Sequence, residues 1–155
     1  MLDAIKSKFP DTPLLVSIGN NDVLVHYSAP IASDKPMFYN DLYDMIFMGH
    51  PGNIRQANLA DIEPKFKEGG FYRYDLGDQL SILVLNSIYF SYRNSEDLAT
   101  ATSQLAWLEA ELAGNPYRMY LISMHIPPML FFFNDLDDFW RESHKNEFLR
   151  IVSTY

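Results

Sequence analysis

A pair of short apolar segments, residues 71–76 and 80–86, constrains the fold of this chain more than any other feature. The dipeptide Gly77-Asp78 separates them, and the second segment begins Leu-Ser-Ile-Leu-Val-Leu. Segments of this length on either side of a glycine-containing turn are typical of an antiparallel β-hairpin. We therefore expect a sheet, around which the other elements are arranged.

Two further apolar segments, residues 14–18 and 117–123, have the length of strands. Residues 20–36 contain two prolines and no steady period, which favours a loop over one end of the sheet. Apolar residues at helical spacing predict five helices, at residues 2–9, 38–48, 54–67 with an interruption near Pro64, 101–112 and 136–152. The order of strands and helices predicts a layered α/β domain.

Charge and composition restrict the partners of the chain. Its 155 residues include 12 basic and 20 acidic side chains, a net charge of −8. Such a surface repels nucleic acid and anionic membranes, so an anionic substrate would need a local cation such as a metal ion. The absence of cysteine excludes disulfides and thiolate metal sites. No apolar run approaches the roughly 20 residues that cross a bilayer, so no transmembrane segment is expected.

Polar residues follow two of the predicted strands. Asn20, Asn21 and Asp22 come shortly after the first, and His125 with two prolines follows the strand at 117–123. At a shared edge of the sheet, an Asn carbonyl oxygen and a His nitrogen are acceptable ligands for zinc, iron or manganese. Taken alone, Asn20 also suits a tight turn, and His125 also suits a buried histidine with satisfied hydrogen bonds.

Five short motifs occur in an order and spacing that resembles the middle of acid-sphingomyelinase-like phosphodiesterases, a branch of the calcineurin-like metallophosphoesterases. They are Gly-Asn-Asn-Asp at 19–22, Gly-Gly-Phe-Tyr at 69–72, Leu-Asn-Ser at 85–87, Gln-Leu-Ala-Trp-Leu-Glu at 104–109 and His-Ile-Pro-Pro at 125–128. The resemblance covers nearly the whole chain. It implies a metallophosphatase-like β-sandwich flanked by helices, with residues 1–155 forming the central part of a single domain and contributing to both sheets.

The resemblance also implies a metal site. In such an enzyme two divalent metal ions, expected to be zinc although other divalent metals are compatible, polarise the scissile phosphate and activate water. Asn20 and His125 match two ligands of one of these metals. The chain contains no Asp-x-His, Gly-Asp-x-x-Asp or Gly-His-x-His motif. The remaining ligands are therefore expected upstream of Met1 and downstream of Tyr155.

Asn21 stands where the commonest form of the family motif has the histidine that protonates the leaving oxygen. A neutral amide cannot act as a general acid. The Asn-Asn-Asp-Val form, with a histidine four residues after the aspartate, resembles the endopolyphosphatase branch, so His26 is the hypothetical substitute. For two other residues the sequence leaves two roles open. Asp22 either orients neighbouring backbone or faces the site, and Asn86 either forms a hydrogen bond to a loop or lines the site.

The substrate implied by the resemblance is a phosphoester, either a sphingomyelin-type lipid or polyphosphate. A lipid would need an apolar rim, for which residues 129–133 are the candidate, whereas polyphosphate would need lysines and arginines. The alternative is a truncated or degenerate fragment that serves at most as a binding module. The family suggests a secreted, lysosomal or vacuolar location, although residues 1–13 lack the pattern of a secretory signal. Of the other histidines, His50 is expected to be structural and His144 to be solvated.

Overall fold

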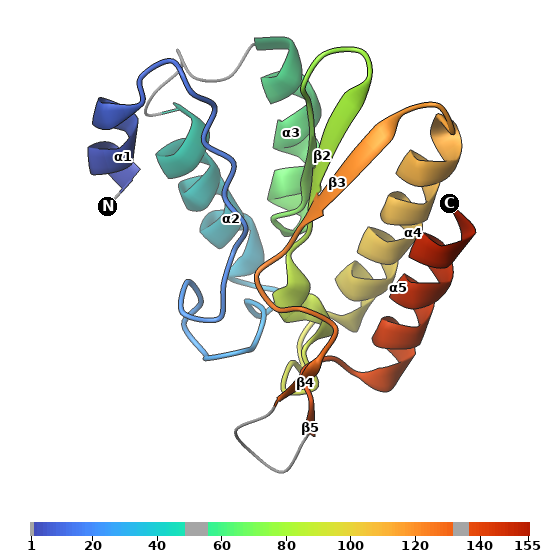
Figure 1. Cartoon of the computed structure of the whole chain (residues 1–155). Helices are drawn as coiled ribbons and strands as arrows, with labels where there is room; N and C mark the ends of the chain where they lie inside the picture. Colours follow the sequence, from blue (N-terminus) through green and yellow to red (C-terminus); the bar gives the residue numbers. More distant parts are fainter. Residues whose placement is uncertain (1, 49–55, 132–136) are drawn as a thin grey trace.

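Three strands form the sheet at the centre of the molecule (Figure 1). The computed structural model describes three stretches of the chain, residues 2–48, 56–131 and 137–155. β1 (Tyr72–Asp75) and β2 (Leu80–Val84) pair antiparallel, which confirms the predicted hairpin. β3 (Met119–Ser123) pairs with β2 in parallel, so the order is β1-β2-β3. The turn between β1 and β2 places Gly77 at φ +84°, a conformation that glycine adopts without steric cost.

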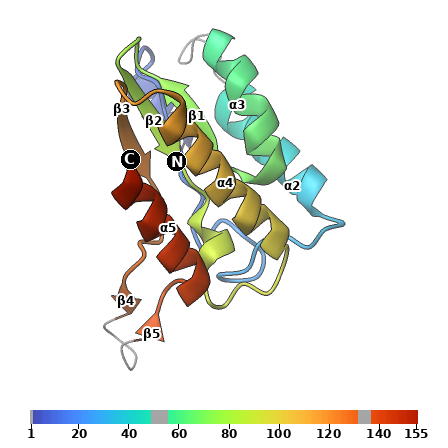
Figure 2. The same cartoon turned by 90° about the vertical axis from the view of Figure 1, so that its right-hand side faces the viewer.

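Helices lie on both sides of this sheet (Figures 1 and 2). The parallel pairing of β2 with β3 needs a crossover connection, which contains α4 (Leu98–Gly114). α4 packs beside α5 (Glu142–Thr154). The other side carries α2 (Lys35–Tyr43) and α3 (Gln56–Gly69), which pack against each other.

Successive residues of β1 show how the sheet separates the two helix layers. The ring of Tyr72 lies 5.8 Å from that of Phe66 in α3, whereas the next residue, Arg73, forms an ion pair with Glu111 of α4. Side chains alternate across a strand, so these two contacts lie on opposite faces. The face toward α2 and α3 holds the main aromatic cluster. Its ring centroids are 5.2–6.3 Å apart and belong to Tyr39, Tyr43, Phe47, Phe66 and Tyr72.

Two of the predicted helices differ in detail from the structure. The helix expected at 38–48 is α-helical to Tyr43 and continues as the π-helix η1 (Asp44–Met48). Lys6 of α1 (Leu2–Lys8) donates to two carbonyls of η1 at 3.2 and 2.7 Å, which joins these two helices. α3 runs without a break through Pro64 because its buried face, which includes Ile62 and Phe66, packs on both sides of the proline.

One predicted strand and the start of one predicted helix were wrong. Residues 14–18 form no strand, since Tyr72 Oη donates to the carbonyl of Val16 at 3.1 Å and accepts from its N–H at 2.9 Å, so a side chain takes the place of a ladder. The helix expected at 136–152 begins six residues later, at Glu142. The cause is Trp140, whose buried ring packs 4.5 Å from that of Phe90 and holds the preceding residues in an extended form.

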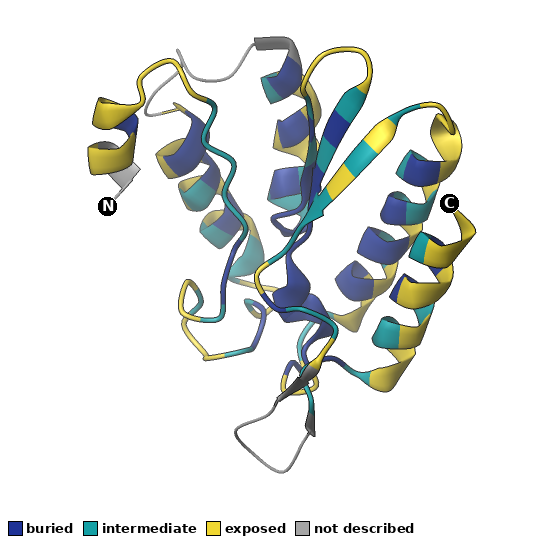
Figure 3. Ribbon diagram, viewed as in Figure 1, coloured by how far each residue is buried: buried dark blue, intermediate teal, exposed yellow. Residues whose placement is uncertain are grey.

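The α/β class is confirmed, and the sheet is small. The described residues form the three-stranded sheet and a separate ribbon of β4 (Leu130–Phe131) with β5 (Asp137–Asp138), so a second full sheet stays a prediction. Exposed residues alternate along β3 (Figure 3), where Met119 and Leu121 are 65% and 52% exposed. Among the described helices, none has the length and apolar content to cross a membrane.

Candidate functional site

The motif at 19–22 forms a tight turn that its own residues close. The N–H of Gly19 donates to Oδ2 of Asp22 at 2.8 Å, and the N–H of Asp22 donates to the carbonyl of Gly19 at 3.0 Å. Aspartate commonly stabilises turns in this way. Of the two roles left open for Asp22, the structure shows the backbone-orienting contact. Asn20 lies inside the turn and is half-buried.

The side chain of Asn20 joins two histidines from distant parts of the chain. Its Oδ1 lies 2.6 Å from Nε2 of His125, and its Nδ2 lies 2.5 Å from Nε2 of His26. Both histidines are exposed, so the buried, fully satisfied histidine considered for residue 125 does not apply. Three of the residues singled out in the sequence are thus gathered at one point of the surface, although 105 positions separate Asn20 from His125.

Gly19 allows His125 to lie close to the turn. A methyl group built on its α-carbon would lie 3.0 Å from Cδ2 and Nε2 of the imidazole. This approach is tighter than nine in ten real contacts of a β-carbon, so a side chain at this position would require the imidazole to shift by a few tenths of an ångström. Gly19 therefore allows His125 to lie this close to the turn.

The backbone after His125 is held by two buried side chains. The N–H of Ile126 donates to Oγ of Ser87 at 2.8 Å, and the carbonyl of the same residue accepts from Nε1 of Trp140 at 3.0 Å. Before the site, Oγ of Ser17 lies 2.9 Å from Oγ of Ser123 and joins the segment leading to Asn20 to the end of β3. The sequence indicated Ser87 only as part of a motif, and nothing in it pointed to Trp140, because both contacts depend on long-range packing.

Asn86 lies in the interior and not at this surface. Its Nδ2 donates to Oη of Tyr39 and to the carbonyl of Gly69, both at 3.0 Å, and it is 1% exposed. Gln104 of α4 bonds both its N–H and its carbonyl, at 2.8 and 3.2 Å. Of the two roles considered for Asn86, the bonding of neighbouring loops matches this position.

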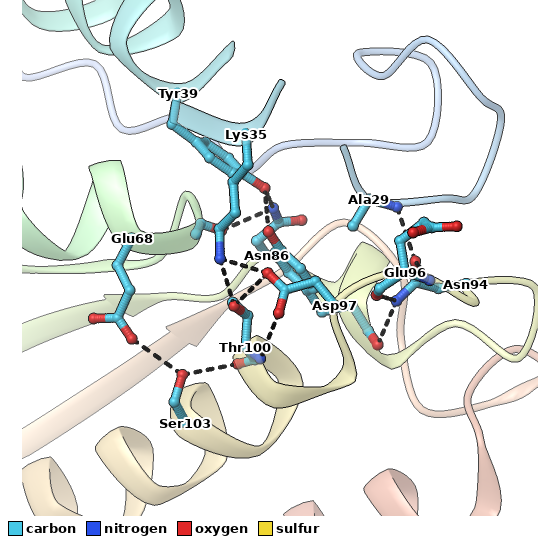
Figure 4. A network of polar contacts seen from close by, with 12 residues as sticks. Ala29, Lys35, Tyr39, Glu68, Asn86, Asn94, Glu96, Asp97, Thr100 and Ser103 are labelled. Atoms are coloured by element: carbon cyan, nitrogen blue, oxygen red, sulfur yellow. Dashed lines mark hydrogen bonds and ion pairs between the residues drawn. The ribbon is translucent and has the colours of Figure 1, made fainter. Parts of the chain in front are cut away.

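Figure 4 shows the polar network that surrounds Asn86. Nζ of Lys35 lies 2.5 Å from both Oδ2 of Asp97 and Oγ1 of Thr100, which connects α2 to the start of α4. Burial raises the pKa of Asp97, but the hydrogen bonds from Lys35 and Thr100 outweigh it and hold that pKa below its usual value. Burial, together with the neighbouring hydroxyl of Tyr89, raises the pKa of Tyr39 well above its usual value. These groups stabilise the scaffold and do not face the histidines.

A cavity of about 670 Å³ lies beside the turn, with Asn21 and Asp22 in its wall. The rest of the wall comes from the loop after the turn, from α2 and from residues 95–96. Sequence reasoning missed this cavity. The signals that could have indicated it are the length of the loop at 20–36 and its apolar run Val23-Leu24-Val25.

Of the other expectations from the sequence, two concern residues that the structure does not describe and one is wrong. Residues 132–133 of the candidate apolar rim, and His50, lie outside the described residues. His144 was expected to be solvated, but it is half-buried against the ring of Phe90 at 5.8 Å, and burial lowers its pKa. Within the described residues, no three acidic, histidine or cysteine side chains are grouped to hold a metal. The residues that the structure brings together at this surface are Asn20, His26 and His125.

No family model matches the chain. Among curated proteins, the human "Acid sphingomyelinase-like phosphodiesterase 3b" is 27% identical over 155 residues, covering 96% of this chain and 32% of the relative. "Sphingomyelinase phosphodiesterase D" of Dictyostelium discoideum is 28% identical over 155 residues, covering 95% of this chain and 32% of that protein. "Sphingomyelinase phosphodiesterase C" of the same organism is 27% identical over 135 residues. The chain spans about a third of the length of these relatives.

Proposed function

We propose, from the distant relationship of this chain to acid sphingomyelinase-like phosphodiesterases, that it forms the central part of a metal-dependent phosphodiesterase. The relationship confirms the resemblance expected from the five motifs, and the names of the relatives support phosphodiester hydrolysis as the activity of the family. The observation that carries the proposal is the contact of Asn20 with both His125 and His26 at the surface.

Asn20 and His125 offer donors of a kind that zinc accepts, and their spacing is close to that of two ligands of one ion. Two ligands of one tetrahedral zinc at about 2.1 Å lie roughly 3.4 Å apart. Oδ1 of Asn20 and Nε2 of His125 are 2.6 Å apart, so the pair needs to open by less than about 1 Å to hold a metal. Both donors are neutral, so further ligands, including anionic ones, come in this proposal from segments beyond residues 1–155.

Each residue of the site has a proposed task. When bound, divalent metal ions polarise the phosphate and supply an activated water. Asn20 and His125 hold one metal, while the Gly19–Asp22 turn and the contacts to Ile126 keep these two donors in place. His26 is exposed and lies next to Asn20, where it can deliver a proton to the leaving oxygen in place of Asn21.

Zinc binding to the purified 155-residue chain tests the metal assignment. Titration calorimetry in metal-free buffer is expected to give one weak site per chain. The substitution Asn20→Ala removes a donor and His125→Gln replaces the imidazole nitrogen with a weaker amide oxygen, so each should lower the zinc affinity by tenfold or more. Parallel assays with bis(p-nitrophenyl) phosphate test whether the zinc-loaded chain hydrolyses a simple phosphodiester.

Two matched variants control for general effects. Asn40→Ala removes an exposed asparagine of α2, and His144→Gln removes a histidine distant in sequence from the motif, so zinc affinity should be unchanged in both. Zinc affinity that is insensitive to Asn20→Ala and His125→Gln would contradict the proposal. Complete absence of zinc binding in a folded chain would instead support the non-catalytic fragment.

A further inference from the structure

Tyr27 has a backbone conformation that a large side chain rarely adopts. Its φ is +66°, and among the described residues only Asp97 shares a positive φ without being glycine. The N–H of Ser28 donates to the carbonyl of Val25 at 2.8 Å, which closes a turn with His26 second and Tyr27 third. Turns with a positive φ at the third position usually have glycine or asparagine there. Contacts of the tyrosine side chain must therefore offset the backbone strain.

The ring of Tyr27 contacts two charged or titratable side chains. Its centroid lies 4.4 Å from that of the His26 imidazole, with an angle of 57° between the ring planes. The guanidinium carbon of Arg93 lies 5.3 Å from the centre of the same ring, within the range of a cation–π interaction. Tyr27 is half-buried, whereas His26 and Arg93 are exposed. The tyrosine ring thus links an exposed histidine to a segment distant in the sequence.

The segment that contains Arg93 is anchored in the interior. The next residue, Asn94, is 0% exposed, and its Oδ1 accepts from the N–H of Ala29 at 2.9 Å (Figure 4). Nδ2 of the same side chain donates to the carbonyl of Glu96 at 2.9 Å. Ala29 is itself 4% exposed. The loop is therefore fixed to this segment at two neighbouring points, the backbone of Ala29 and the ring of Tyr27.

We propose that Tyr27 is a positioning residue, whose ring holds the imidazole of His26 beside the amide of Asn20. An exposed histidine samples several rotamers, and contact with a ring that is itself held by Arg93 restricts it to the one seen here. Nε2 of His26 then stays close to Nδ2 of Asn20, 2.5 Å away. A proton donor acts best when its position is fixed in advance. The inference deepens the proposed function and rests on it only for the proton that His26 delivers.

NMR spectroscopy of the metal-free 155-residue chain tests the inference. Nuclear Overhauser effects between the imidazole protons of His26 and the side-chain amide protons of Asn20 measure how often the two groups are in contact. Effects between the backbone protons of Val25 and Ser28 report separately whether the turn is intact. Because neither metal nor substrate is present, the result does not depend on whether His26 delivers a proton or whether the chain binds zinc.

Two substitutions of Tyr27 separate the ring from the backbone. Tyr27→Asn removes the ring but supplies a residue that tolerates a positive φ, so the turn should persist. The His26–Asn20 signal should then lose about two thirds of its intensity, because the imidazole spreads over three staggered rotamers. Tyr27→Phe keeps the ring and should retain the full signal.

Two further variants complete the design. Arg93→Ala removes the cation that holds the ring, so the His26–Asn20 signal should fall, although less than in Tyr27→Asn. Tyr117→Asn is the matched control, since Tyr117 is 91% exposed and lies outside the loop and its contacts. It should leave both the turn and the signal unchanged.

Two results would overturn the inference. One is a full His26–Asn20 signal in Tyr27→Asn, which would mean that the amide of Asn20 alone holds the imidazole. The other is a signal lost equally in Tyr27→Phe and Tyr27→Asn, which would assign the effect to the hydroxyl group and not to the ring. If Tyr27→Asn loses the turn itself, Arg93→Ala decides, and an unchanged signal in that variant overturns the inference.

Discussion

Gly19 has a testable role at the scale of single residues because the imidazole of His125 lies against its α-carbon. In Gly19→Ala the new methyl group would be 3.0 Å from two ring atoms, so the exposed ring must shift by a few tenths of an ångström from its present place beside Asn20. We expect zinc affinity to fall about tenfold, as for other changes that misplace a metal ligand. The free energy of unfolding should change little, since an exposed ring can move. Titration calorimetry and urea unfolding measure the two quantities.

Gly114 provides the matched control for this substitution. A methyl group built there meets no atom within 4 Å, and the residue lies at the far end of α4. Gly114→Ala should bind zinc as the unmodified chain does. If Gly19→Ala retains full zinc affinity, the close approach to His125 is not what requires glycine at this position.

Ser87 holds the backbone beside His125, and its removal should affect both stability and metal binding. Ser87→Ala leaves the buried N–H of Ile126 without its acceptor, which costs about 1–3 kcal/mol of unfolding free energy. Zinc affinity should also fall, because the loop that carries His125 is released. Ser143→Ala, on the exposed start of α5, should change neither quantity. A loss of stability with unchanged zinc affinity would limit Ser87 to a structural role.

The sequence indicated the residues that meet at this surface better than it indicated what supports them. The motifs at 19–22 and 125–128 indicated Asn20 and His125, and the spacing of His26 from Asp22 indicated the third residue. The structure places both histidines within hydrogen-bonding distance of the amide of Asn20, and their roles stay a prediction. The support by Trp140 was not predictable, because its contact with Ile126 depends on where α5 begins.

At the scale of elements, Gln104 links α4 to the backbone that follows β2 by hydrogen bonds. The side-chain amide of Gln104 bonds the N–H and the carbonyl of Asn86, where β2 has just ended. Gln104→Leu keeps the volume similar and leaves both buried backbone groups unpaired, so we expect a loss of about 2–4 kcal/mol in unfolding free energy. Urea unfolding measures it. Thr102→Ala, two residues earlier on the exposed side of α4, should stay within about 0.5 kcal/mol.

The elements that sequence reasoning placed correctly are those with strong local signals. The hairpin at 72–84 has its turn dipeptide, and α4 has a buried stripe that reaches Leu112, two residues before the helix ends at Gly114. Residues 14–18 have the composition of a strand as well. The backbone of Val16, however, forms its hydrogen bonds with the hydroxyl of Tyr72, a residue 56 positions away in the sequence. Local propensity carries no information about such a partner, and the same is true of Trp140 and the start of α5.

At the scale of the whole molecule, two ion-pair networks make stability depend on pH. The pKa of Asp75 is lowered, since hydrogen bonds from Arg73 and Ser81 outweigh the opposing effect of burial, and Lys35 and Thr100 do the same for Asp97. A carboxyl whose folded pKa is depressed stabilises the fold above its unfolded pKa of about 3.9 and loses this contribution as pH falls through the folded value. We therefore expect the unfolding free energy to decrease below about pH 4.

Urea unfolding at several pH values measures this dependence. The double variant Asp75→Asn, Asp97→Asn should be less stable at pH 7 and should show a smaller decline below pH 4. Asp61→Asn, an exposed residue of α3, should keep the full decline. A decline of unchanged size in the double variant would assign the acid sensitivity to other carboxylates.

The five motifs converge in space although they are scattered in sequence. Gly70 packs so closely that an added methyl group would meet Ile18 and Asn86, Ser87 bonds Ile126, and Gln104 bonds Asn86. One continuous set of contacts thus connects the turn at 19–22 with the loop at 125–128. The chain that holds it covers about a third of the length of its relatives.

The amide of Asn20 also makes its two histidines unequal. Oδ1 of an amide only accepts and Nδ2 only donates, so Nε2 of His125 faces an acceptor whereas Nε2 of His26 faces a donor. One side chain thus presents opposite ends of its dipole to the two rings. In the proposed metal site, Nε2 of His125 would offer its lone pair to the ion, so its present contact with Oδ1 would first have to open. Metal binding at this pair would therefore compete with a contact inside the protein.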